Sequence, residues 1–158
     1  MRLQEHEFKH ALAVLRAVRP DIEQEVRALL SGLNIPLGRG HRPTPSEQVV
    51  ARFAQAGWAR DYAFKGGLKF DLFKDGVAIE VQLSDRRDTY NDLLKFLLAY
   101  NLEVIEVGIA IVYGDDCRGR GFEETPRLSH LRRDLELFRR VIPCPIWAIG
   151  LACGGEGR

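Results

Sequence analysis

Hydrophobic residues near the start of the sequence recur at helical spacing. They are Phe8, Leu12, Leu15 and Val18. This period places apolar side chains on one face of a helix, so the pattern predicts a helix in this segment. Pro20 interrupts that helix, and the apolar positions that follow predict a second one, which Gly32 and Asn34 end. We therefore expect residues 1–34 to form a helical N-terminal extension.

A loop and a third helix follow this extension. Residues 34–45, NIPLGRGHRPTP, are rich in Gly, Pro and Asn, which indicates a loop. Thr44 then suits a helix N-cap, Pro45 suits the first helical position, and Glu47 suits the third position after the cap. Together they predict a capping box at the start of this helix.

The middle of the chain alternates between polar and apolar residues in two segments, Lys69–Phe73 and Val77–Leu83. Asp75-Gly76 lies between them, and this dipeptide between alternating segments is a strong β-hairpin signal. A two-residue turn there would place Asp71 opposite Glu80. The expected core face has five apolar residues, Phe70, Leu72, Ile79, Val81 and Leu83. The opposite face has Lys69, Asp71, Glu80 and Gln82. A slip of one residue would turn the apolar face to water, so this register is favoured.

The remaining pattern predicts an α/β fold. We expect strands at residues 58–64, 104–113 and 145–151, and helices at about residues 88–100 and from Thr125-Pro126 onward. A hairpin followed by β-α-β indicates a mixed β-sheet flanked by helices. We expect one domain over residues 1–158, with its core in residues 44–151 and a loose tail at residues 152–158.

The opposed carboxylates require compensation, because like charges directly opposite on a hairpin are destabilising. A divalent cation is one explanation: oxygen ligands suit Mg²⁺, and the backbone carbonyl of Val81 and the side chain of Gln82 lie beside the pair. The alternative is an acidic solvent face in which Lys69 neutralises Asp71 and Glu80.

Composition narrows the classes of function. The chain has 158 residues, of which 46% are hydrophobic and 28% are charged, as in folded globular domains. A net charge of +1 excludes a strongly basic, histone-like binding mode but leaves room for a local basic patch. No apolar run is long enough to suggest a membrane span, and the first residues have no signal-peptide pattern.

The three cysteines, Cys117, Cys144 and Cys153, form no CxxC pair. We expect three free thiols and a cytoplasmic protein, because neither a disulfide framework nor a zinc site fits this number and spacing.

The segment FDLFKDGVAIEVQLSDRRDTYNDLLKFLLAY contains Asp71 followed by Glu80-Val81-Gln82. In this it resembles the PD-(D/E)xK nucleases, and in particular the BglII-type restriction endonucleases, in which Gln takes the place of the usual Lys. The resemblance extends from about residue 44 to residue 113. It implies a restriction-endonuclease-like fold and Mg²⁺-dependent hydrolysis of DNA phosphodiester bonds.

The resemblance also implies roles for individual residues. Asp71, Glu80 and the carbonyl of Val81 would bind Mg²⁺, and Gln82 would help to place the attacking water. Lys69 is a possible supporting residue. Glu47 would support the metal site as a glutamate of the first conserved helix, or it would act only in the capping box.

Four arginines in loops are candidates for binding the DNA backbone: Arg39, Arg42, Arg86 and Arg87. We expect double-stranded DNA as the partner, and a homodimer because two strands need two sites, with the N-terminal helices as candidates for the interface. Two alternatives stay open. One is a non-catalytic DNA-binding or assembly module that keeps the nuclease fold, and the other is an α/β domain whose acidic hairpin is plain surface.

Overall fold

The computed structural model describes residues 1–38, 40–84, 88–119, 122 and 124–153. The strands within these ranges are β1 (Leu3–Phe8), β2 (Ala59–Lys65), β3 (Leu68–Lys74), β4 (Val77–Val81), β5 (Val107–Tyr113) and β6 (Ile146–Leu151). The helices are α1 (Ala11–Val18), α2 (Pro20–Ser31), α3 (Pro45–Gln55), α4 (Thr89–Asn101) and α5 (Leu128–Leu137).

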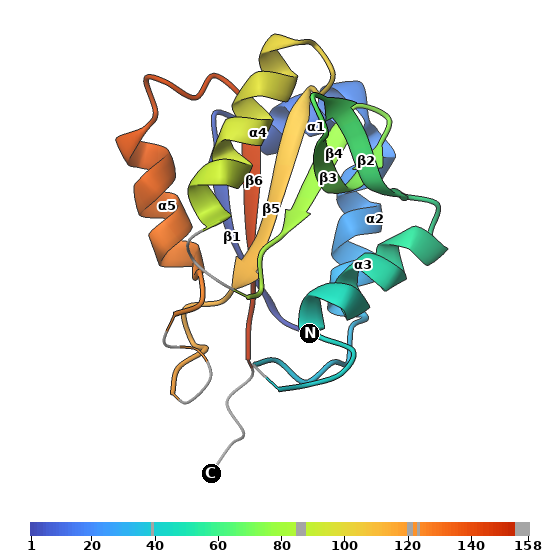
Figure 1. Ribbon diagram of the computed structural model, residues 1–158, viewed down its shortest axis with the longest axis vertical. Helices are drawn as coiled ribbons and strands as arrows, with labels where there is room; N and C mark the ends of the chain where they lie inside the picture. Colours follow the sequence, from blue (N-terminus) through green and yellow to red (C-terminus); the bar gives the residue numbers. More distant parts are fainter. Residues whose placement is uncertain (39, 85–87, 120–121, 123, 154–158) are drawn as a thin grey trace.

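These strands form a six-stranded mixed sheet in the order β1-β6-β5-β4-β3-β2 (Figure 1). The central strands β4, β5 and β6 run parallel, whereas β1 pairs antiparallel with β6, and β2 and β3 continue the sheet antiparallel beyond β4. Every residue of β4, β5 and β6 is buried, as expected for parallel strands with both faces covered. The α/β fold predicted from the sequence is thus confirmed.

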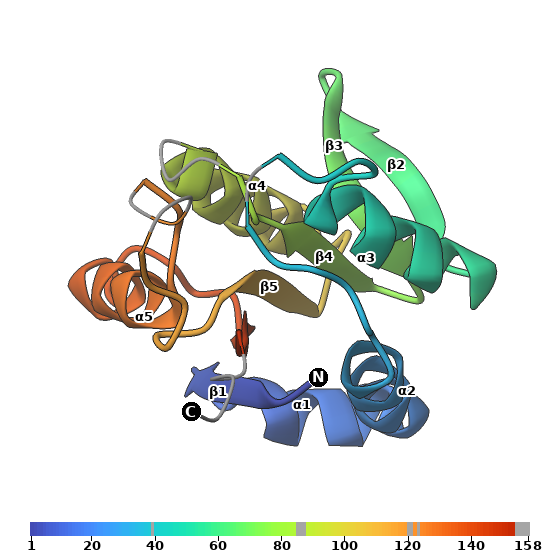
Figure 2. The same cartoon turned by 90° about the horizontal axis from the view of Figure 1, so that it is seen from below.

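Helices cover both faces of the sheet, and Figure 2 shows α4 and α5 on the side opposite α1 and α2. One hydrophobic cluster joins α1, α2 and α3 to the sheet through residues such as Leu15, Val26 and Phe53. The other joins α4 and α5 through residues such as Phe96 and Leu135. The sheet is therefore the middle of three layers, and α4 is the helix that faces β3 and β4 on the second side.

The N-terminal segment differs from the expected helical extension. Residues Leu3–Phe8 form strand β1, which pairs with β6 from Leu3↔Leu151 to Phe8↔Ile146. The apolar spacing that begins at Phe8 therefore belongs to a helix only from Ala11 onward. The alternation in β1 is weak, because its residues are partly exposed and include several charged side chains, so its pairing with β6 was not visible in the sequence.

The Asp75-Gly76 hairpin is confirmed, with Lys74 paired to Val77 and Leu72 paired to Ile79. Asp75 has φ 48° and Gly76 has φ 80°, the positive values that a two-residue type I′ turn requires at both positions.

The expected core face of the hairpin is wrong at one residue. Leu72 and Ile79 belong to the cluster under α1–α3, but Phe70 belongs to the cluster under α4. Its ring lies 5.6 Å from that of Phe96 and 4.6 Å from that of Phe64, measured between centroids. The pairing of β3 with β4 extends only as far as Leu72, and before that residue β3 pairs with β2 alone. Because β4 does not pair with β3 at Phe70, the pairing with β4 does not determine which face of the sheet this side chain occupies.

The cysteines also differ from expectation. Cys117 and Cys153 form a disulfide, and Cys144 is a buried free thiol. The sequence has no motif that pairs them, because one lies in the loop after β5 and the other after β6, and only the parallel pairing of β5 with β6 brings them together. Among the described residues, no helix is long and apolar enough to cross a membrane.

Candidate active site

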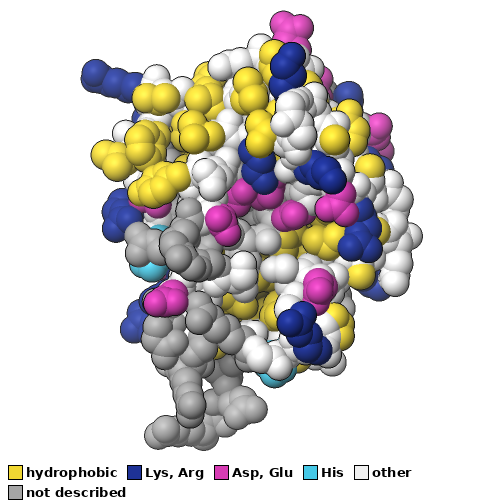
Figure 3. Space-filling model, in the orientation of Figure 1, with side chains coloured by type: hydrophobic (Ala, Val, Ile, Leu, Met, Phe, Trp, Pro, Cys, Tyr) yellow, Lys and Arg dark blue, Asp and Glu magenta, His cyan; other side chains and the backbone are white. Residues whose placement is uncertain are grey.

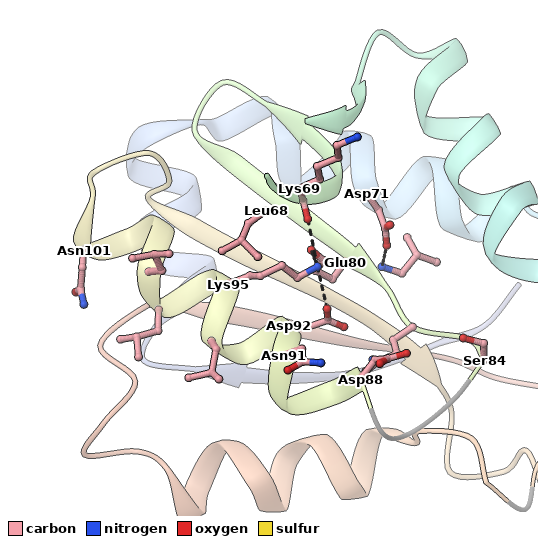
Figure 4. Close-up of a pocket in the computed structure, with 15 residues that line it drawn as sticks. Leu68, Lys69, Asp71, Glu80, Ser84, Asp88, Asn91, Asp92, Lys95 and Asn101 are labelled. Atoms are coloured by element: carbon pink, nitrogen blue, oxygen red, sulfur yellow. Dashed lines mark hydrogen bonds and ion pairs between the residues drawn. The ribbon is translucent and has the colours of Figure 1, made fainter. Parts of the chain in front are cut away.

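A cavity of roughly 900 Å³ lies where β3 and β4 meet α4 (Figure 4). Five residues singled out from the sequence line it: Lys69, Asp71, Glu80, Val81 and Gln82. Acidic and basic side chains gather across the middle of this face of the molecule, as Figure 3 shows. The structure therefore brings the predicted acidic hairpin residues together in a concave site.

The two strands position the carboxylates differently. Glu80 lies in β4, pairs in register with Ala110 of β5, and is only 4% exposed. Asp71 lies in β3 at the edge of the cavity, and its Oδ2 accepts a hydrogen bond of 2.7 Å from the backbone N–H of Val81. A charged acceptor strengthens such a bond, so Asp71 fastens the two strands just beyond their last ladder pair.

Helix α4 contributes two charged residues that the sequence analysis missed, Asp92 and Lys95. The Nζ atom of Lys95 lies 2.5 Å from Oε1 of Glu80 and 3.0 Å from Oδ1 of Asp92, and it donates a 3.2 Å hydrogen bond to the carbonyl of Lys69. The side chain of Lys69 points away from this cluster in Figure 4. The ammonium that compensates Glu80 thus comes from Lys95, and the suggestion that Lys69 neutralises the pair is wrong.

A weak sequence signal for these two residues exists. Asp92 and Lys95 have the i, i+3 spacing of neighbours on a helix surface, in the first helix after the Glu80 strand. The same spacing occurs on many solvent-exposed helices, so the sequence does not show that this pair faces a strand.

Acidic groups outnumber basic ones in the cluster. Burial, together with the charges of Asp92 and Asp71, raises the pKa of Glu80 to about 9, although Lys95 acts in the opposite direction. Burial also raises the pKa of Asp92 to about 6, again against the effect of Lys95. One ammonium paired with Glu80 and Asp92, with Asp71 as a further acidic neighbour of both, leaves an excess of negative charge, so without a further cation the cluster retains a proton near neutral pH.

Gln82 lies directly after β4 and is held from two sides. Its backbone N–H donates to the carbonyl of Ile111 at 2.8 Å, which continues the β4–β5 pairing by one residue. The hydroxyl of Thr89, in the first turn of α4, donates to Oε1 of Gln82 at 2.9 Å. Gln82 is 8% exposed, so this amide is a fixed part of the cavity wall.

Glu47 has the role that local sequence indicated. The Thr44 side chain accepts from the N–H of Glu47, and Oε2 of Glu47 accepts from the N–H of Thr44 at 2.6 Å, which confirms the capping box. Glu47 is absent from the lining of the cavity and lies in a separate groove beside α3. Its neighbour Ser46 is closer to the site, with Oγ 3.5 Å from the carbonyl oxygen of Val81.

Of the four predicted DNA-binding arginines, Arg42 lies within the described residues. Arg39, Arg86 and Arg87 lie outside the described residues. Arg42 is exposed in the loop before α3 and does not line the cavity; its charge contributes to lowering the pKa of Glu47, after the larger effect of hydrogen bonds from Thr44.

The donor atoms of the cavity fit a hard divalent cation. In the described part of the chain, no three acidic, histidine or cysteine side chains converge on one point. The expected ligand set needs only two carboxylates, Asp71 and Glu80, and the carbonyl of Val81. These are oxygen donors of the kind Mg²⁺ prefers, and the excess negative charge favours an added cation.

Comparisons with known proteins identify the family and the fold. A family model described as restriction endonuclease BglII/BglIII matches residues 3–151. Among solved structures, restriction endonuclease BglII complexed with a DNA 16-mer matches with a TM-score of 0.83, at 16% sequence identity, over 99% of this chain and 79% of that chain. Free BglII matches with a TM-score of 0.75, at 17% identity, over 99% and 82%. None of the curated proteins compared with the chain matches it.

Proposed function

Since the chain belongs to the BglII/BglIII restriction endonuclease family, we propose that it is a Mg²⁺-dependent endonuclease that hydrolyses phosphodiester bonds in double-stranded DNA. The observation that carries this proposal is the cavity in which Asp71 and Glu80, from adjacent strands, lie within one concave site beside Gln82. Family membership supports endonuclease activity. The metal, the residue roles and the type of DNA are part of the proposal.

In this proposal Asp71, Glu80 and the carbonyl of Val81 hold Mg²⁺. A bound Mg²⁺ polarises the phosphoryl oxygen and lowers the pKa of its water. Hydrolysis then joins a water oxygen to phosphorus and breaks one ester bond, while a proton from the water leaves and the departing oxygen gains one.

An amide takes up no proton near neutral pH, so Gln82 cannot act as a general base. In this scheme it orients the attacking water instead. Thr89 holds the oxygen of this amide, which directs the NH₂ group of Gln82 away from Thr89. The fixed amide therefore supplies a hydrogen-bond donor of defined direction, and a Mg²⁺ held by Asp71 and Glu80 would supply the chemistry that lowers the pKa of the attacking water.

Arg86 and Arg87 are the proposed contacts with the DNA backbone. Ser84 and Asp88, which flank this part of the chain, both line the cavity. Arginine pairs bidentately with phosphate, so Arg86 and Arg87 would hold the DNA backbone without reading its sequence. Arg39 and Arg42 are proposed as weaker contributors, because Arg42 lies outside the cavity.

We further propose that the protein acts as a homodimer through α4 and α5, rather than through its N-terminal helices. Six large apolar side chains are exposed among the described residues: Leu68, Tyr90, Leu94, Leu102, Leu137 and Val141. None of them lies in α1, α2 or α3. An apolar hollow of about 290 Å³ separates α4 from the segment after α5, lined in part by Tyr90 and Val141. A two-fold contact here would cover apolar surface and place two sites on one DNA.

The cytoplasm is the proposed location, because a restriction-type enzyme acts on DNA inside the cell. The disulfide between Cys117 and Cys153 stands against this proposal, since cytosolic thiols are normally kept reduced. The number of free thiols in protein isolated from cytosol under alkylating conditions would show whether Cys117 and Cys153 are reduced or disulfide-bonded there.

A non-catalytic DNA-binding module is the alternative function, favoured by the neutral Gln82.

Cleavage of supercoiled plasmid DNA with Mg²⁺ or Mn²⁺ tests the proposed function. We expect wild type to nick and linearise the plasmid. Asp71→Asn and Glu80→Gln should each lower the rate at least ~100-fold. Each removes a negative charge that would bind Mg²⁺, and the Mg²⁺ would neutralise the negative charge that develops on the phosphate. Asp21→Asn is the matched control, since Asp21 is an exposed carboxylate in α2.

A wild-type protein that binds DNA but does not cut it under these conditions would support the non-catalytic alternative. Undiminished cutting by either site variant would remove that residue from the site.

A further inference from the structure

The ammonium of Lys95 is held inside the cavity by three oxygen atoms. Oε1 of Glu80 lies 2.5 Å away, Oδ1 of Asp92 lies 3.0 Å away, and the carbonyl of Lys69 accepts at 3.2 Å. The contacts with Glu80 and Asp92 are ion pairs, and the contact with the Lys69 carbonyl is a hydrogen bond, so the ammonium has an oxygen partner on each of three residues. Figure 4 shows the side chain extending from α4 across to β4.

This position differs from that of an ordinary surface lysine, whose ammonium extends into water. Its side chain is 18% exposed and lines the cavity, as Leu94 and Leu98 do, instead of extending into water. Burying an ammonium is costly unless it is paired, so the two carboxylates and the lysine depend on one another. The site therefore contains a fixed positive charge that comes from a helix and is absent from the Glu80-Val81-Gln82 strand.

We propose that Lys95 supplies, from α4, the ammonium that position 82 lacks, and that it stabilises the negative charge that develops on the phosphate during hydrolysis. This inference rests on the proposed endonuclease function. Gln82 is neutral and fixed by Thr89, whereas Lys95 has a flexible four-carbon stem and a compact charge. If Asp71 and Glu80 hold a cation, Lys95 would lose part of its interaction with Glu80, and its ammonium would then have an N–H donor for a phosphate in the cavity.

The proposal predicts two effects of opposite sign in Lys95→Met, which keeps the length of the side chain and removes its charge. The single-turnover cleavage rate at saturating enzyme should fall ~100-fold, the usual scale for losing an electrostatic contact to developing charge. The affinity for Mn²⁺, measured by calorimetry without DNA, should rise about 3- to 10-fold, because a like charge beside Glu80 is gone.

Lys65→Met is the matched control, since Lys65 is an exposed lysine on β2 outside the cavity and should change neither quantity. The double variant Lys95→Met with Gln82→Lys moves the ammonium from the helix to the strand. We expect it to recover at least ~10-fold of the lost rate.

The outcomes separate this inference from the proposed function. A wild-type protein that cleaves no DNA overturns both. An active wild type with an equally active Lys95→Met overturns the role of Lys95 alone, as do unchanged Mn²⁺ affinity or failure of the double variant to recover activity. If Lys95→Met melts below the assay temperature, the comparison is made between Asp92→Asn and Asp92→Asn with Lys95→Met, in which one buried carboxylate is already neutral.

Discussion

Glu80 is the residue on which three elements of the fold act at once. β4 buries it, α4 brings Asp92 and Lys95 to it, and β3 places Asp71 nearby. Its raised pKa is the result of burial first and of the neighbouring carboxylates second. Such perturbation is typical of functional sites, and the proposed cation-binding role would account for acidic groups held so close together.

The raised pKa has a consequence for stability in the absence of metal. An unfolded glutamate has a pKa of about 4.3, whereas Glu80 in the folded protein has a pKa of about 9. The folded state therefore binds more protons than the unfolded state between these values, so the contribution of Glu80 is greatest below about pH 4.3 and is lost as pH rises toward 9.

We therefore expect the free energy of unfolding of wild type, minus that of Glu80→Gln, to decrease from pH 5 to pH 9 by about 1–3 kcal/mol in chelator. Urea unfolding at a series of pH values measures this difference, and subtracting the glutamine variant cancels the titration of groups that do not interact with Glu80. A difference that is constant or increases with pH would show that Glu80 is ionised throughout.

Residue-level prediction from the sequence succeeded where one local pattern sufficed. The Asp75-Gly76 turn fixes the hairpin, and the hairpin brings Asp71 and Glu80 to one cavity. Asp92 and Lys95 could not be obtained in this way. Their place depends on how α4 packs across the sheet through Phe96 and its neighbours, which is a tertiary contact with no local signal.

At the scale of elements, the start of α3 decides between two roles for Glu47, helix capping and support of a metal site. The capping box satisfies two backbone N–H groups at the start of the helix, and Glu47 supplies one of its acceptors. We expect Thr44→Ala to lower the free energy of unfolding by about 1 kcal/mol, the usual cost of losing an N-cap.

Plasmid cleavage tests whether Glu47 also contributes to a metal site. Glu47→Gln retains the capping box, since glutamine also serves at this position, and we expect it to cleave DNA as wild type does. A large loss of cleavage in Glu47→Gln without a loss of stability would instead place Glu47 in the metal site.

Elements with strong periodicity were predicted well, and those defined by pairing at the edge were not. The helix at α4 and the buried strand at β5 follow from apolar patterns that are visible over ten or more residues. β1 is an edge strand with polar and charged residues, so its sequence lacks the alternation of a half-buried strand. The neighbouring helix pattern therefore extended, wrongly, over it.

At the scale of the whole molecule, the exposed apolar residues of α4 and α5 suggest how two copies would associate. Leu137 and Val141 are 71% and 59% exposed, and neither lines the cavity of the candidate site. A monomer gains nothing from leaving such side chains in water, whereas a two-fold interface would bury them on both subunits.

We expect Leu137→Asp with Val141→Asp to convert a dimer into a monomer, because charges at the centre of an apolar interface are strongly unfavourable. Light scattering after size-exclusion chromatography measures the mass, and thermal melting checks that the variant is folded. Wild type that is monomeric at micromolar concentration, or a dimeric double variant, would contradict an interface at α4 and α5.

The pairing of β1 with β6 joins the two ends of the described chain at one edge of the sheet. β6 follows β1 and the strands β2 to β5 in the sequence, so during synthesis β1 leaves the ribosome before β6 and stays without this partner until the intervening strands have been made. Contacts between such distant segments also slow folding in general, because the chain between them has to be ordered before the contact forms. The nascent chain therefore exposes the pairing edge of β1 until β6 has been made, and only then can this sheet be completed.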